Sequence, residues 1–210
     1  MSGLLERGEM SRSIGEIPDM QPGLDRDLTA VTERLRRITV QVYGSGTGVG
    51  SGVIWTPGGL IVTNAHVARR RARIVLAGGR KLDARLVAWD PERDLAALVI
   101  DAYSLGGAEL RDSDTVRVGE LVVAVGAPHG QAGAVSMGVV YAVVAPRLAS
   151  PGFIQADLRL APGNSGGPLA DAQGRVIGIN AMVVGGLAVA VPSNAVARFV
   201  ASLPNRAAVS

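Results

Sequence analysis

The sequence predicts an all-β fold, an antiparallel barrel or sandwich arrangement, with one short helix before it and one after it. Between residues 38 and 192, roughly a dozen short runs of β-branched and apolar residues follow one another at spacings of about 8–12 residues. Gly, Pro and Asp separate these runs, and strand and helix patterns do not alternate, which argues against a doubly wound parallel sheet. Apolar residues make up 48% of the 210 residues, enough to bury a core.

The first 22 residues predict a flexible N-terminal arm, because they are polar, contain Gly and Pro and have no periodicity. A helix is expected next, over about residues 24–36. Its apolar residues recur at helical spacing, and its acidic residues precede its arginines, the order that the helix dipole favours. The apolar residues are Leu24, Leu28, Val31 and Leu35.

The predicted strands run from I-T-V-Q-V-Y at 38–43 to L-A-V-A-V at 187–191. The Gly-rich stretch 44–52 predicts a hairpin and matches no dinucleotide or phosphate-binding motif. The sequence D-A-Q-G at 171–174 predicts a tight turn with its glycine in the left-handed conformation. The polar stretch 106–114 is the candidate boundary between two β halves, and Pro192 and Ser193 precede a closing helix.

Composition and charge exclude several functions. The chain has no Cys, which excludes disulfides, thiolate metal sites and a cysteine nucleophile. Its only histidines are His66 and His129, too few for a His-rich metal site, and its net charge of +3 is too small to indicate a nucleic-acid partner. No apolar run reaches the roughly 18 residues of a membrane span, and no signal peptide is visible. A cytoplasmic location is therefore expected for the residues given, or a periplasmic or secreted one if a signal peptide preceded them.

Three segments carry residues that suit acyl-transfer chemistry. His66 follows the predicted strand in L-I-V-T-N-A-H-V, Asp94 directly precedes the apolar run 95–100, and Ser165 lies between glycines in A-P-G-N-S-G-G-P-L. Each has an ordinary structural explanation by itself: a core or loop histidine, a turn aspartate and a Gly-rich turn. Together they supply a base, an acid that orients it and a nucleophile. The backbone N–H groups of Gly163 and Ser165 are candidates for an oxyanion hole.

The order of these residues along the chain separates the possible folds. G-N-S-G-G also matches the nucleophile elbow of α/β-hydrolases, but that fold places its His after the Ser, and no His follows Ser165. The subtilisin order needs an Asp before the His, and the aspartates before His66 lie in the predicted arm or first helix. The order His, Asp, Ser is that of chymotrypsin-like barrels, which agrees with the strand pattern.

Four motifs resemble the protease domain of the HtrA (Deg) family of trypsin-like serine proteases: T-N-A-H-V, D-P-E-R-D-L-A-A-L, G-N-S-G-G-P-L and A-V-P-S-N. The resemblance covers about residues 38–204 and implies a protease domain over 23–210. It implies two six-stranded antiparallel β-barrels, at about 38–110 and 113–192, a closing helix at about 193–203 and an active site between the barrels. It implies His66, Asp94 and Ser165 as the catalytic triad, Gly163, Asn164 and Ser165 as the oxyanion loop, and no metal or cofactor.

The resemblance also implies a function and partners. We expect a serine endopeptidase that hydrolyses unfolded or extended polypeptides in protein quality control. The alternatives are a protease-fold chaperone or binding module with a gated site, and an esterase that uses the same triad. HtrA proteins often form homotrimers through N-terminal aromatic residues, whereas the first aromatic here is Tyr43. They usually carry PDZ domains after the protease domain, whereas this sequence ends at Ser210, so either a stand-alone protease domain or a trimmed chain is expected.

By the same resemblance, Leu160 and Val183 should form the walls of the primary specificity pocket, with Met182 nearby and Asn180 at its edge. The segments 159–164 and 178–189 contain no carboxylate that could pair with a basic substrate side chain. We therefore expect cleavage after small or medium aliphatic residues. His129, in G-A-P-H-G, is expected to be a loop residue outside the site, the alternatives being a second base or a substrate contact.

Overall fold

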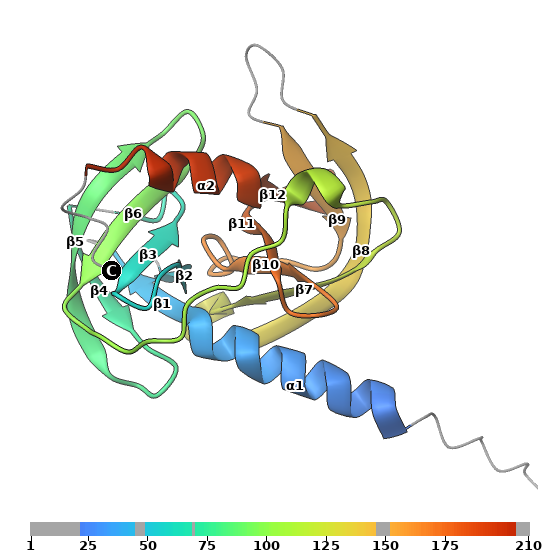
Figure 1. Cartoon of the computed structure of the whole chain (residues 1–210), viewed down its shortest axis with the longest axis horizontal. Coiled ribbons are helices and arrows are strands. Elements are labelled where there is room, and N and C mark those ends of the chain that lie inside the picture. Colours follow the sequence, from blue (N-terminus) through green and yellow to red (C-terminus); the bar gives the residue numbers. More distant parts are fainter. Residues whose placement is uncertain (1–21, 45–48, 69, 146–151, 205–210) are drawn as a thin grey trace, which may run out of the picture.

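The computed structural model describes residues 22–44, 49–68, 70–145 and 152–204, and in these residues two closed β-barrels lie side by side (Figure 1). A long helix runs beneath them in the view of Figure 1, and a shorter helix lies across the top. Of the expected flexible arm, residues 1–21 lie outside the described residues. The last residue of that arm, Pro22, is the first residue of the N-terminal helix.

Barrel one consists of β1 (Thr39–Tyr43), β2 (Val49–Ile54), β3 (Leu60–Thr63), β4 (Arg71–Val75), β5 (Lys81–Asp90) and β6 (Leu95–Ile100). Its strands pair in the closed order β1-β2-β3-β6-β5-β4, and every pairing is antiparallel. The Gly-rich stretch at 44–52 connects β1 to β2, and these two strands pair as the expected hairpin. Residues 45–48 lie outside the described residues. Barrel one occupies the left side of Figure 1.

Barrel two consists of β7 (Leu121–Gly126), β8 (Ala134–Val144), β9 (Phe153–Asp157), β10 (Pro168–Asp171), β11 (Val176–Val184) and β12 (Leu187–Pro192). Its closed order is β7-β8-β9-β12-β11-β10, so its connections repeat those of barrel one strand for strand. Six strands form each barrel in the part of the chain that the structure describes, and this confirms the expected fold class.

Two helices hold the barrels together. The N-terminal helix α1 (Pro22–Ile38) is longer at both ends than the predicted 24–36, contacts β1 and β7, and buries Val31, Leu35 and Ile38. The closing helix α2 (Ser193–Ala201) begins where Pro192 and Ser193 predict it and contacts β6, β11 and β12. The buried faces of both helices join a core cluster that contains strands of both barrels, so the two barrels share one packed interface.

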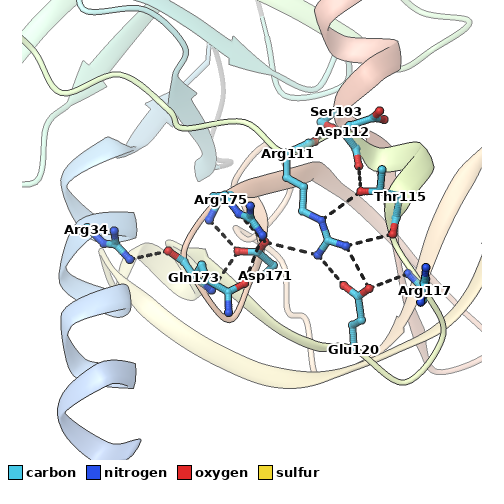
Figure 2. A network of polar contacts seen from close by, with 10 residues as sticks. All are labelled: Arg34, Arg111, Asp112, Thr115, Arg117, Glu120, Asp171, Gln173, Arg175 and Ser193. Carbon is cyan, nitrogen blue, oxygen red and sulfur yellow. Dashed lines mark hydrogen bonds and ion pairs between the residues drawn. The ribbon is translucent and has the colours of Figure 1, made fainter. Parts of the chain in front are cut away.

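A polar network ties α1 and the segment between the barrels to barrel two (Figure 2). Arg111 binds both carboxylate oxygens of Glu120, at 2.6 and 3.0 Å, and lies 3.5 Å from Asp171. Asp171 begins the predicted tight turn, in which Gly174 has φ +78°, and it accepts a 2.9 Å hydrogen bond from Arg175 Nε. Arg34 of α1 donates to the backbone carbonyl of Gln173 in the same turn.

Replacing Glu120 with Gln should lower the free energy of unfolding at neutral pH by about 1–2 kcal/mol. The hydrogen bonds from Arg111 hold the pKa of the Glu120 carboxyl below its usual range, against the opposing effect of burial. Because the folded-state pKa is the lower one, this contribution is present above the unfolded pKa of about 4.3 and is lost as the pH falls through the folded-state value. Denaturant unfolding at pH 7 and at pH 3 measures both effects.

The matched control is Glu109→Gln, an exposed glutamate of the same inter-barrel segment, which should change stability by less than about 0.5 kcal/mol. An equal loss for Glu120→Gln at both pH values would contradict the assigned ion pair, as would a loss no larger than that of the control.

Candidate active site

Barrel one brings His66 and Asp94 together. His66 lies in the turn after β3 and Asp94 directly precedes β6; these strands are neighbours, with Thr63 paired to Ala96. His66 Nδ1 lies 2.8 Å from Asp94 Oδ2 and 3.0 Å from Oδ1, and the backbone N–H of His66 donates to Oδ1 at 3.1 Å. A carboxylate at Nδ1 favours the tautomer with its proton on that nitrogen, which leaves Nε2 as a proton acceptor.

The backbone at Asp94 is strained, and a buried side chain stabilises it by a hydrogen bond. Asp94 has φ +53°, a left-handed conformation that residues with a side chain seldom adopt. The amide Nδ2 of Asn64, which has no exposed surface, donates to the Asp94 carbonyl at 2.9 Å. The sequence pattern did not identify Asn64 as a residue that supports the site. The available signal was its position two residues before His66.

Ser165 lies in the loop between β9 and β10, and the loop packs against the end of β3. A Cβ atom on Gly166, whose φ is +88°, would lie 2.0 Å from the Ser51 carbonyl oxygen and 2.3 Å from Thr63 Oγ1. The close approach therefore requires glycine at position 166. It places the serine loop of barrel two beside the strand that leads to His66.

The Ser165 hydroxyl is hydrogen-bonded to a backbone carbonyl. Its Oγ donates to Ala181 O at 2.9 Å, and among the described residues no hydrogen bond joins it to His66. Ala181 lies where the register of β11 against β12 shifts between Asn180 and Met182, a bulge of the kind often found beside active sites. Catalytic hydrogen bonds often form only when substrate binds. The Ser165 side chain would have to rotate and break its hydrogen bond to Ala181 O before Oγ could donate to His66 Nε2.

The loop before Ser165 presents two free backbone donors. Within the described part of the chain, neither the Gly163 N–H nor the Ser165 N–H donates a hydrogen bond, whereas the Asn164 N–H donates to Ala161 O at 3.0 Å. Gly163 has φ +108°, and a Cβ atom there would lie 2.2 Å from Ala127 O. An oxyanion hole needs backbone N–H groups that are free to bind the developing charge. Asn164 is buried, and its own N–H is already used inside the turn.

The residues expected at the specificity pocket fall into two groups. Met182 and Val183, at the end of β11, are 51% and 49% exposed, and Leu160 is half-buried. Asn180 has no exposed surface, and its Nδ2 donates to Pro168 O at 2.8 Å. In this conformation the Asn180 side chain therefore stabilises the chain just after the serine loop. Leu160, Met182 and Val183 present apolar surface.

His129 contributes through its backbone. It lies in the turn between β7 and β8 with an exposed side chain and φ +50°, and its N–H donates to Pro162 O at 3.1 Å. Its contact with the oxyanion loop was missed at the sequence level, because a backbone donor leaves no signature in residue type.

The described residues offer few places for a cofactor or metal. A hollow of about 1120 Å³ lies on the β4–β5 side of barrel one, is lined by Arg71, Arg73, Lys81 and Arg85 among others, and includes none of the expected triad. No cluster of three or more metal-binding His, Asp or Glu side chains occurs in residues 22–44, 49–68, 70–145 and 152–204. Over the same ranges, neither helix has the length and apolar character needed to span a bilayer.

Comparisons with known proteins identify the family of the chain. The model of the trypsin-like peptidase domain matches residues 50–179. A probable periplasmic serine endoprotease DegP-like of Halomonas elongata is 42% identical over 139 residues, which cover 64% of this chain and 29% of the relative. A protein of the same name from Pseudomonas savastanoi pv. phaseolicola is 37% identical over 180 residues, 80% of this chain and 37% of the relative. The chain thus spans about a third of the length of these curated relatives.

A solved structure shows the same fold. The HtrA-type protease AlgW with tripeptide superposes with a TM-score of 0.78 at 34% sequence identity, covering 83% of this chain and 62% of that chain. The family model covers more than half of the sequence and spans His66, Asp94 and Ser165. The chain belongs to the trypsin-like peptidase domain family, with HtrA-type and DegP-like serine proteases among its relatives.

Proposed function

We propose that the protein is a serine endopeptidase with His66, Asp94 and Ser165 as its catalytic triad. The observation that carries the proposal is the His66–Asp94 pair, in which Nδ1 lies 2.8 Å from a carboxylate oxygen. Nε2 has no hydrogen-bond partner in the part of the chain that the structure describes. Ser165 is the nucleophile on this proposal, because its loop lies beside β3 and carries two free N–H groups. The chain's membership of a peptidase family supports the same assignment.

The reaction begins when the Ser165 hydroxyl turns from Ala181 O to His66 Nε2. Oγ attacks the carbonyl carbon of the scissile peptide bond, and its proton passes to Nε2. The carbonyl oxygen becomes an oxyanion that accepts hydrogen bonds from the Gly163 and Ser165 N–H groups. The ionised Asp94 stabilises the imidazolium of His66 without taking its proton.

The tetrahedral intermediate then collapses. The C–N bond breaks, and His66 gives its proton from Nε2 to the leaving amine, which departs and leaves an ester between the acyl group and Ser165. Water attacks this ester, with His66 Nε2 taking a water proton, and a second oxyanion forms in the same place. When the C–Oγ bond breaks, Oγ regains the proton from His66, and the product carboxylic acid leaves.

Extended polypeptides are the proposed substrates. A β-barrel cleft can pair with an extended chain through backbone hydrogen bonds, which a folded protein does not offer. The HtrA-type structural neighbour AlgW was solved with a tripeptide and with a decapeptide, so a protein that contains this fold binds peptides. We also propose a role in protein quality control and assembly as a homotrimer. A periplasmic location is proposed because the names of the curated relatives contain it.

A second candidate is a protease-fold binding module or chaperone whose site is gated. The observation that favours it is the Ser165 Oγ bond to Ala181 O, which occupies the hydroxyl that His66 would have to deprotonate. An esterase would use the same residues on small acyl substrates.

Incubation of the protein with unfolded casein and with a fluorophosphonate probe tests these functions together. An endopeptidase cleaves casein and is labelled at Ser165. Labelling without casein cleavage indicates an esterase or a gated state, and the absence of both indicates a binding module. The Ser165→Ala variant distinguishes the chain's own activity from a contaminating protease.

Substrate cleavage should occur after Val, Ala, Ile or Leu. Leu160, Met182 and Val183 present apolar surface, and a basic side chain buried there without a carboxylate partner would cost several kcal/mol. One methylene more or less in the substrate should change kcat/KM by about 10–200-fold. Mass spectrometry of casein fragments measures the residue before each cut.

Val183→Asp places a carboxylate in the proposed pocket and should raise the rate of cleavage after Lys and Arg. Val184→Asp, at the neighbouring position with 51% exposure, is the matched control and should leave the preference unchanged. Dominant cleavage after Lys or Arg by the parent protein would overturn the pocket assignment.

A further inference from the structure

Ser51, in β2 of barrel one, makes two hydrogen bonds to the serine loop of barrel two and a third to the turn after β7. Its Oγ donates to Gly163 O at 2.6 Å and accepts from the Ala127 N–H at 2.9 Å. Its backbone N–H donates to Ser165 O at 2.8 Å. Ser51 has no exposed surface, so these bonds form away from water, where a hydrogen bond is electrostatically stronger.

The bonds from Ser51 act on the peptide groups that flank the two free donors. Gly163 O belongs to the peptide between Gly163 and Asn164, and Ser165 O to the peptide after Ser165. The peptide before Gly163 is fixed separately, since Pro162 O accepts from the His129 N–H at 3.1 Å. With these three carbonyls held inside the protein, the N–H groups of Gly163 and Ser165 remain unpaired among the described residues.

The oxyanion loop needs these hydrogen bonds because its glycine allows the backbone to adopt other conformations. Gly163 has φ +108°, and glycine passes readily between conformations that other residues avoid. Without the Ser51 hydroxyl, the one hydrogen bond that Gly163 O would keep among the described residues is the 3.3 Å bond from the Ala127 N–H. Rotation of the peptide after Gly163 or of the peptide after Ser165 would shift the adjoining peptides, which carry the Gly163 and Ser165 N–H groups. A displacement of about 1 Å can cost about 100-fold in rate.

We propose that Ser51 is a positioning residue that holds the oxyanion loop of barrel two in its catalytic conformation from barrel one. This inference rests on the proposed function of Ser165 as the nucleophile. Ser51 touches neither substrate nor reacting atoms; it acts through Gly163 and Ser165. The hydrogen bonds of Ser51 thereby connect the oxyanion loop of barrel two to barrel one, which carries His66 and Asp94.

Ser51→Ala tests the proposal, with Ser193→Ala as the matched control. Ser193 is 2% exposed, and its Oγ donates to Arg111 O at 2.6 Å, so the control removes an equally buried serine hydroxyl and an equally short bond to a carbonyl. Both variants should lose similar thermal stability. Only Ser51→Ala should lower kcat for a peptide substrate, by about 10–100-fold, with KM changed by less than about threefold.

A peptide boronic acid supplies a readout that a merely structural role would not move. It forms a tetrahedral adduct on the serine whose oxygen occupies the oxyanion position, so its inhibition constant should rise in Ser51→Ala by about the same 10–100-fold as kcat falls. The dissociation constant of the peptide product, which forms no covalent adduct with Ser165, should be unchanged. If Ser51→Ala does not fold, Ser51→Cys, which keeps a weak S–H donor, should fold and show a smaller loss of the same kind.

The outcomes separate the two claims. A parent protein without Ser165-dependent hydrolysis overturns the proposed function and this inference with it. An active parent whose Ser51→Ala variant keeps its kcat and its boronic acid affinity overturns the inference alone. Equal losses of kcat in Ser51→Ala and Ser193→Ala also overturn it, because a general loss of stability would then explain both.

Discussion

Replacing Ser165 with Ala should lower kcat for peptide hydrolysis by about 10⁴–10⁶-fold and abolish labelling by a fluorophosphonate. Without Oγ no acyl-enzyme can form, and the rate that remains comes from the oxyanion donors and substrate binding alone. The only hydrogen bond that the variant loses among the described residues is the one to Ala181 O, so the protein should stay folded. Single-turnover kinetics on a peptide substrate measure the change.

Ser202→Ala is the control for this experiment. Its hydroxyl also donates to a backbone carbonyl, that of Phe199 at 2.7 Å, but it lies at the end of α2. It should retain full activity. Activity near that of the parent in purified Ser165→Ala would remove Ser165 from the mechanism, and a thermal scan of both variants would exclude unfolding as the cause of a loss.

Replacing His66 with Ala should lower kcat by a factor of about 10⁴–10⁶, comparable to the loss of the serine, because the members of a triad act as a unit. A histidine base accepts a proton only when it is neutral, so activity of the parent should rise as the pH is raised from acid values. His66→Ala should remove this rise from whatever activity remains. A pH profile of kcat/KM for parent and variant measures both effects.

His129 supplies the control, since it is the other histidine of the chain. Its side chain is exposed and its φ is +50°, a conformation that Asn tolerates well, so His129→Asn preserves the backbone contact with Pro162. It should leave the pH midpoint in place. A profile that loses its rise in His129→Asn and keeps it in His66→Ala would show that the wrong histidine had been assigned as the base.

The elements that could be predicted from the sequence are those that local patterns encode. The helical spacing of Val31 and Leu35 predicted α1, and D-A-Q-G predicted the turn in which Gly174 has φ +78°. The C-terminal end of α1 could not be predicted, because Ile38 becomes part of the helix by packing into the core between the barrels. Likewise the bulge at Ala181 reflects how β11 pairs with β12, and residue type does not specify that pairing.

The sequence by itself determined the all-β class, the order His66, Asp94, Ser165 and the glycines that flank the serine, since each is a matter of residue type and spacing along the chain. Only the tertiary structure decided how these parts meet. The two barrels repeat one strand order without a repeat in the sequence, Asn64 reaches the Asp94 carbonyl, and Ser51 bonds to Gly163 across 112 positions of the chain. In both contacts the acceptor is a backbone carbonyl, which every residue carries, so the sequence does not show which residue the Asn64 or Ser51 side chain will meet.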